Sequence, residues 1–285
     1  VKQFEEDGVE AKLTIPAPAQ FLAELFRGDN TRNTREYYPN TEELLQDIAA
    51  AYRTFFHEVY AAGCRTVQLD DCTWGMIVDD DFWKSMAGSG FTLEHEALQY
   101  LKVNNLAIGD KPEGLTVNTH VCRGNYHSCY ATKGAYDPVA PWLFAKENVD
   151  TYYLEYDDER SGGFEPLKLV TPEKRVVLGL LTTKSPVLED KASVIARIRE
   201  AAKYVPLERL SLSPQCGFAS CEIGNKLTEE QQWAKLALVR EIVEEVVGVA
   251  LGAIPRKGAI VGISLFDFRD LSPCVWQLFC TFAKG

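Results

Sequence analysis

The chain has 285 residues, 46% of them hydrophobic, and its 30 basic and 41 acidic side chains give a net charge of −11. The apolar fraction is typical of a globular protein, and the acidic balance argues against non-specific binding to nucleic acid or to an anionic membrane. No apolar run reaches the roughly 18 residues needed to span a membrane. The first residues, VKQFEEDGVEAKL, lack the basic and apolar regions of a secretory signal. Eight cysteines in a chain of this length favour thiols in a reducing compartment over a disulfide scaffold, so we expect a cytoplasmic protein.

Short apolar segments alternate along the chain with longer amphipathic ones. The longest amphipathic segment, residues 41–63, has helical periodicity, with Thr41 as a candidate N-cap and Gly63 as its stop. We interpret the whole pattern as six strand–helix units. The predicted strands are 11–18, 64–71, 114–122, 150–158, 174–184 and 208–218, and the predicted helices are 41–63, 92–105, 138–148, 188–205 and 228–248.

This alternation favours a parallel sheet covered by helices, an α/β fold. Polar residues gather at the C-terminal ends of the predicted strands, which is where functional sites lie in a (β/α)8 barrel. They are Asp70 and Asp71, His120 and Cys122, Glu155, residues 182–184 and Cys216. A doubly wound open sheet is the alternative, but it should carry a glycine-rich phosphate loop after its first strand, and TIPAPAQF is not one.

Some of these residues form a candidate set of metal ligands. His120 and Cys122 are two positions apart, so in a strand both side chains point to the same face. Glu155 and Cys216 follow at the ends of two other predicted strands. A mixed set of nitrogen, sulfur and oxygen ligands suits tetrahedral zinc. The spacing alone is also compatible with a buried cysteine beside a hydrogen-bonded histidine.

Three segments of the chain resemble cobalamin-independent methionine synthase: THVCRGN, YYLEYDDERSG and LSPQCGF with the following NKLTEEQQWAKLALVREIVEEV. The resemblance covers about residues 8–247 and is closer to short bacterial homologues that consist of the C-terminal catalytic barrel. It implies a (β/α)8 barrel, of which this chain carries the third to eighth units and lacks the first two. It also implies zinc bound by His120, Cys122, Glu155 and Cys216.

The resemblance further assigns the substrate residues. QLDDC matches a family strand end whose aspartate binds the amino group of homocysteine, which places that role, and a catalytic one, on Asp70. Asp71 and Asp157 are further candidates for substrate contacts. The structural alternatives are a loop cap for Asp70 and a solvated turn for Asp157. The predicted domains are a methyltransferase barrel, 1–248, and an apolar tail of unknown role, 249–285.

The function that follows is zinc-dependent methyl transfer to a small thiol. The family's thiol is homocysteine, its donor is 5-methyltetrahydropteroyltri-L-glutamate and its product is methionine. Two alternatives stay open. The segment LGLLTTKSP has no histidine where the parent enzyme has one, which favours another thiol or a non-folate donor. A truncated barrel that has lost catalysis is the other. We expect no nucleic-acid or membrane partner, and exposed barrel edges allow a homo-oligomer.

Overall fold

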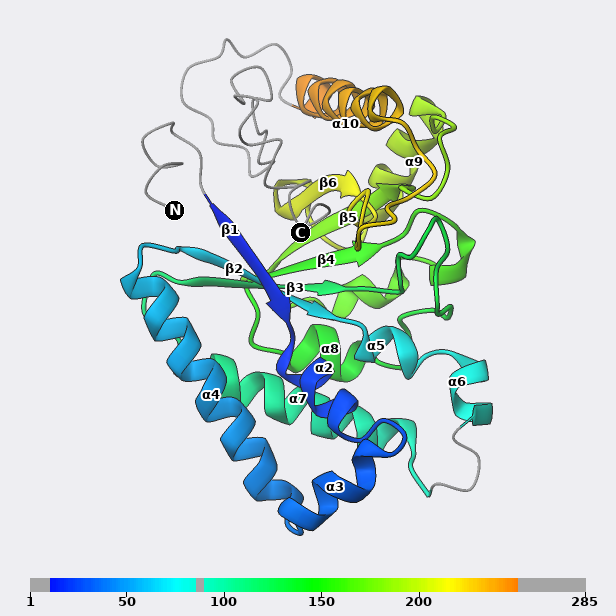
Figure 1. Ribbon diagram of the computed structural model, residues 1–285. Coiled ribbons are helices and arrows are strands. Elements are labelled where there is room, and N and C mark those ends of the chain that lie inside the picture. The colour runs from blue at the N-terminus through cyan, green and yellow to red at the C-terminus, as the bar shows by residue number, and fades with distance from the viewer. Residues whose placement is uncertain (1–10, 86–89, 251–285) are drawn as a thin grey trace. The chain divides into compact units, whose positions relative to one another are not determined.

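The computed structural model describes residues 11–85 and 90–250 (Figure 1). Within these residues, six parallel strands form one sheet, and helices connect most of them. The strands lie side by side in the sheet in the same order as they follow along the chain. This confirms the predicted α/β class. The strands are β1 Lys12–Pro16, β2 Thr66–Asp71, β3 Thr116–Val121, β4 Thr151–Glu155, β5 Arg175–Leu181 and β6 Leu210–Pro214.

The chain divides into two compact units. The first holds the described residues up to 122, together with 132–153 and 169–174. The second holds 123–131, 154–168 and the described residues from 175 onward. The predicted tail begins at residue 249, and residues 251–285 lie outside the described ranges, so this domain boundary stays a prediction.

The first unit contains β1, β2 and β3 and most of the helices. Its helices are α2 Pro18–Leu25, α3 Asn30–Tyr37, α4 Thr41–Ala61, α5 Thr73–Met76, α6 Asp80–Ser85, α7 Leu93–Ile108 and α8 Ala140–Lys146. Helices α2, α4 and α7 pack on one another (Figure 1). The side-chain cap of α4 is Asn40, whose Oδ1 accepts a hydrogen bond from the Glu42 N–H at 3.0 Å, so the predicted cap at Thr41 is wrong by one residue.

The register of the first three strands brings predicted site residues level with one another. Pro16 pairs with Asp70, and Asp70 pairs with His120. The apolar residues of β2 and β3, such as Val67, Leu69 and Val117, are fully buried. Burial of these apolar side chains fixes the register, because a slip by one residue would turn them to the opposite face.

The second unit contains β5, β6, α9 Lys191–Ala201 and α10 Glu229–Ala250. Only the 3₁₀ helices Glu159–Ser161 and Glu165–Leu169 lie between β4 and β5. None of the five predicted helices falls in this segment either, so the expected alternation of six strand–helix units is wrong at this step. Gly179 of β5 is required by close packing, since a Cβ there would lie 2.7 Å from Gln215 Cα and 2.8 Å from Leu154 O. This approach brings the end of β6 against β5. None of the helices in the described part of the chain has the length and the apolar run that a membrane crossing requires.

Candidate metal centre

His120 lies near the end of β3 beside Asp70 on β2. Its Nδ1 is 3.1 Å from Asp70 Oδ1, and the residue is almost fully buried. An Nδ1–H that donates to a carboxylate fixes the ring and leaves Nε2 as the ligand atom, as is usual for histidines that bind metals. Burial alone would raise the pKa of Asp70, but hydrogen bonds from His120 and Gln68 and the charge of Lys12 hold it below its usual value. Asp70 is therefore a charged partner of the histidine.

The two cysteines of the predicted set lie just beyond the ends of their strands. Cys122 follows the last residue of β3, and its N–H donates to Asp71 O at 3.0 Å. Cys216 lies two residues past the end of β6, so the predicted strand 208–218 extends too far. The preceding residue is held on both sides: Gln215 N–H donates to Leu181 O at 2.8 Å, and its Nε2 donates to Thr183 Oγ1 at 2.7 Å.

Glu155 is the last residue of β4 and is fully buried. Its Oε1 accepts a hydrogen bond from the Arg123 N–H at 3.0 Å, and its Oε2 accepts one from Arg160 Nη2 at 2.9 Å. A carboxylate has about four lone-pair sites, so both bonds leave room for a metal. Without these donors, the buried charge of Glu155 would be strongly destabilising.

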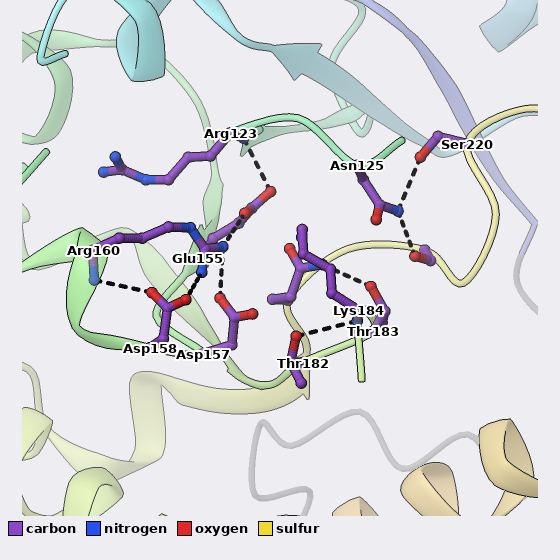
Figure 2. A network of polar contacts seen from close by, with 12 residues as sticks. Arg123, Asn125, Glu155, Asp157, Asp158, Arg160, Thr182, Thr183, Lys184 and Ser220 are labelled. Atoms are coloured by element: carbon purple, nitrogen blue, oxygen red, sulfur yellow. Dashed lines mark hydrogen bonds and ion pairs between the residues drawn. The ribbon is translucent and has the colours of Figure 1, made fainter. Parts of the chain in front are cut away.

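Arg160 is the cation that organises this acidic segment. Figure 2 shows it among Glu155, Asp157 and Asp158, with ion-pair distances of 2.9, 2.7 and 2.5 Å. Burial opposes its charge, but the three carboxylates raise the pKa of the guanidinium above its usual value. The Asp157 carboxylate is buried against Arg160, which gives it a structural role. Its predicted contact with substrate stays a prediction.

The four predicted ligands form a cluster that could hold a metal ion. His120, Cys122, Glu155 and Cys216 each offer one ligand atom, and these atoms all lie within 4.8 Å of one another. Tetrahedral zinc with nitrogen and sulfur ligands separates them by roughly 3.3–3.8 Å, which follows from Zn–N and Zn–S bonds of about 2.0 and 2.3 Å. The donor set of one imidazole, two thiols and one carboxylate fits zinc.

Asp71 belongs to a different cluster. It is fully buried, and its Oδ1 accepts hydrogen bonds from the Thr73 N–H at 2.9 Å and the Thr73 hydroxyl at 2.5 Å, at the start of α5. Its Oδ2 accepts from Asn104 Nδ2 at 3.0 Å. Burial raises the pKa of Asp71. The predicted substrate contact of Asp71 stays a prediction, and the structure gives this carboxylate a clear role in packing.

The same amide of Asn104 donates to a second buried carboxylate. Asn104 Nδ2 lies 2.7 Å from Glu147 Oε1, and Asn104 Oδ1 accepts a hydrogen bond from the Ala19 N–H at 2.9 Å. Burial, and then the charge of Asp71, raise the pKa of Glu147 to about 8. Sequence reasoning missed both residues, because an asparagine and a glutamate in or beside predicted helices look like ordinary surface residues.

The chain is therefore an α/β protein with a candidate metal centre. Its sheet has polar residues at the strand ends, and four of them offer nitrogen, sulfur and oxygen ligands. Comparison with known proteins then gives the family. Residues 30–243 match the family described as "Cobalamin-independent synthase, Catalytic domain". The chain belongs to this family, and its catalytic domain is like that of methionine synthase.

Several individual proteins are similar to this chain over most of its length. The uncharacterized protein YxjG of Bacillus subtilis (strain 168) is 45% identical over 82% of this chain. A Listeria monocytogenes protein, provisionally described as a vitamin-B12-independent methionine synthase, has a crystal structure that is 34% identical, with a TM-score of 0.64 over 84% of this chain. A B12-independent methionine synthase from Shewanella sp. W3-18-1, solved with selenomethionine, has the same fold, with 20% identity and a TM-score of 0.60 over 88% of the chain. The chain spans 61%, 64% and 65% of these three proteins.

Proposed function

We propose that this chain is a zinc-dependent methyltransferase that transfers a methyl group to a small thiol. The observation that carries the proposal is the convergence of His120, Cys122, Glu155 and Cys216 within 4.8 Å. Zinc held by such ligands supplies Lewis acidity and lowers the pKa of a thiol that joins it, so that the thiolate forms near neutral pH. The membership of the family of cobalamin-independent synthases supports this chemistry.

The residues of the chain prepare the site for this reaction. Arg160 and the Arg123 N–H hold the Glu155 carboxylate in place and balance its charge. Asp70 orients His120 and keeps an exposed side-chain surface of 44%, from which it can also meet a cation. An amino acid with a thiol carries such a cation in its ammonium group, and a carboxylate is its natural partner. Asp70 therefore serves both as the orienting partner of His120 and as the contact for substrate.

Homocysteine is the thiol that we propose, with a methylated folate polyglutamate as donor and methionine as product. The Shewanella protein of the same fold was solved in complex with selenomethionine, an analogue of this product. The Asp70 carboxylate attracts the ammonium group of an amino acid and repels a thiol whose only charges are negative. An amino acid is therefore the better substrate for this site.

A second candidate is transfer of an alkyl group to a different thiol or from a donor other than folate. It is favoured by the residues after β5, which are Thr182, Thr183 and Lys184 where the parent enzyme has a histidine. A site without that imidazole lacks one route for moving a proton near neutral pH. The donor and thiol are therefore to be tested independently.

The test is methyl transfer by the purified chain with homocysteine and a second small thiol, each offered with a folate and a non-folate methyl donor. We expect methionine from homocysteine and methyl folate, abolished by a chelator and restored by zinc. Turnover only with another thiol or donor would select the second candidate. No turnover with any pair, in a folded chain loaded with zinc, would refute both and favour a barrel that has lost catalysis.

A further inference from the structure

The tripeptide Arg123-Gly124-Asn125 follows the candidate ligand Cys122 directly, and its last residue, Asn125, has no role in the proposed chemistry so far. Asn125 is nearly fully buried, with an exposed fraction of 6%. A buried amide in a loop carries a cost unless each of its polar atoms is bonded. The partners of this amide show what it holds in place.

Asn125 bonds to the turn that carries Cys216. Its Nδ2 donates to Gly217 O at 2.7 Å and to Ser220 Oγ at 3.0 Å, as Figure 2 shows for Ser220. The carbonyl of Gly217 belongs to the residue immediately after Cys216, so this bond restrains the backbone next to the candidate thiolate. Both protons of the amide group have acceptors.

The oxygen of Asn125 bonds to a second asparagine. Asn225 Nδ2 donates to Asn125 Oδ1 at 2.8 Å and to Thr183 O at 2.8 Å, and Asn225 Oδ1 accepts from the Ser128 N–H at 2.9 Å. The two amides thus tie together the loop 123–131, the segment after β5 and the turn after β6. A polar network in which each amide atom is bonded rigidifies the segments that it joins.

The backbone of the tripeptide reaches another ligand. The Arg123 N–H donates to Glu155 Oε1 at 3.0 Å, and Arg123 O accepts from the Ala131 N–H at 2.8 Å, which closes the loop. Gly124 between them has φ +89°, and a Cβ there would lie 2.6 Å from Ala131 N. Only glycine fits this turn.

From these contacts we infer that Asn125 is a positioning residue of the metal centre, which fixes the Cys216 turn while the backbone beside it fixes Glu155. The inference rests on the proposed zinc site and deepens it. Groups that orient metal ligands typically contribute a factor of 10–100 in metal affinity. Asn125 acts through the Gly217 carbonyl and Asn225 and contacts no substrate in this role.

The experiment compares zinc affinity in the unsubstituted chain and in Asn125→Ala, by competition with a chromophoric chelator. The matched control is Asn105→Ala. Asn105 makes the same kind of tie in the first unit, where its Nδ2 donates to Lys146 O at 2.9 Å and its Oδ1 accepts from the Asn148 N–H at 2.8 Å. We expect zinc binding about 10–100-fold weaker in Asn125→Ala and unchanged in Asn105→Ala.

The outcomes separate this inference from the proposed function. If the unsubstituted chain binds no zinc, the proposed function fails. If that chain binds zinc and Asn125→Ala binds it within twofold, or both variants lose affinity equally, the positioning role is refuted. If circular dichroism shows that Asn125→Ala does not fold, Asn225→Ala takes its place. This substitution removes the donor to Asn125 Oδ1 together with the bonds of Asn225 to Thr183 O and the Ser128 N–H, and it leaves Asn125 itself in place. Unchanged zinc affinity in folded Asn225→Ala would then overturn the inference.

Discussion

Glu147 should make the folded chain less stable as the pH rises, and Glu147→Gln should remove this effect. The carboxyl is fully buried, and its Oε1 accepts a hydrogen bond from Asn104 Nδ2 at 2.7 Å. Burial, followed by the charge of Asp71, raises its pKa from 4.5 to about 8, against the opposing effects of Asn104 and Lys174. Glutamine keeps the shape and the acceptor for Asn104 but cannot ionise.

The sign and the size of this pH effect follow from the difference in proton binding between the folded and the unfolded chain. Between about pH 4.5 and 8 the unfolded chain has lost this proton and the folded chain has kept it, so stability falls by about 1.4 kcal/mol per pH unit. The stabilisation is complete below the unfolded pKa and is lost as pH rises through the folded pKa. A shift of about 3.5 units (8 minus 4.5) sets an upper bound of about 5 kcal/mol. Asp71 shares Asn104 with Glu147, so the two carboxyls titrate as a pair and the measured change is expected at about 3–5 kcal/mol.

Urea unfolding at a series of pH values from about 5 to 9 measures this difference. The stability of Glu147→Gln relative to the unsubstituted chain should increase across the series and level off above about pH 8. Glu58→Gln, on an exposed position of α4, is the control and should follow the unsubstituted chain. A constant offset between Glu147→Gln and the unsubstituted chain at all pH values would refute the raised pKa of Glu147, because it would show a change in packing without a change in ionisation.

Two further substitutions test the partner of His120 and a buried ion pair of the second unit. Asp70→Ala should weaken zinc binding about 10–100-fold, since it removes the carboxylate 3.1 Å from His120 Nδ1; unchanged affinity in the chelator competition would remove its orienting role. Lys235→Met should lower the free energy of unfolding by about 3 kcal/mol in urea, because it leaves Glu189 without the buried ammonium that lies 2.9 and 3.0 Å from its two oxygens. A loss below about 1 kcal/mol would show that the pair contributes little.

The strands could be predicted because their signal is local. Apolar residues of β2 and β3 are buried as their pattern indicates, and the polar residues that follow them lie at the strand ends. The helices α2 and α3 could not be found in the same way. The α3 sequence NTRNTREY is polar, with Thr34 as its only buried residue, so it lacks the apolar stripe that reveals a helix.

The candidate ligands could be predicted by residue type and motif, but their supporting contacts could not. The adjacency of Asp70 and His120 depends on the β2–β3 register, and the bond from Asn125 to Gly217 joins residues 92 positions apart. The surroundings of Asp71 show most clearly why such contacts could not be predicted. It neighbours Asp70 in sequence, yet alternation along the strand turns it into the buried cluster with Asn104.

The zinc content of the purified chain, measured beside that of Cys216→Ser, tests the central claim most directly. We expect about one zinc per chain and a large loss of zinc in the variant, because serine removes one of the two thiolates that zinc prefers. Far-UV circular dichroism should show both proteins folded. Two results would contradict a zinc site at these residues: a folded chain that carries no zinc after purification in zinc-containing buffer, or a Cys216→Ser variant that retains the full amount of zinc.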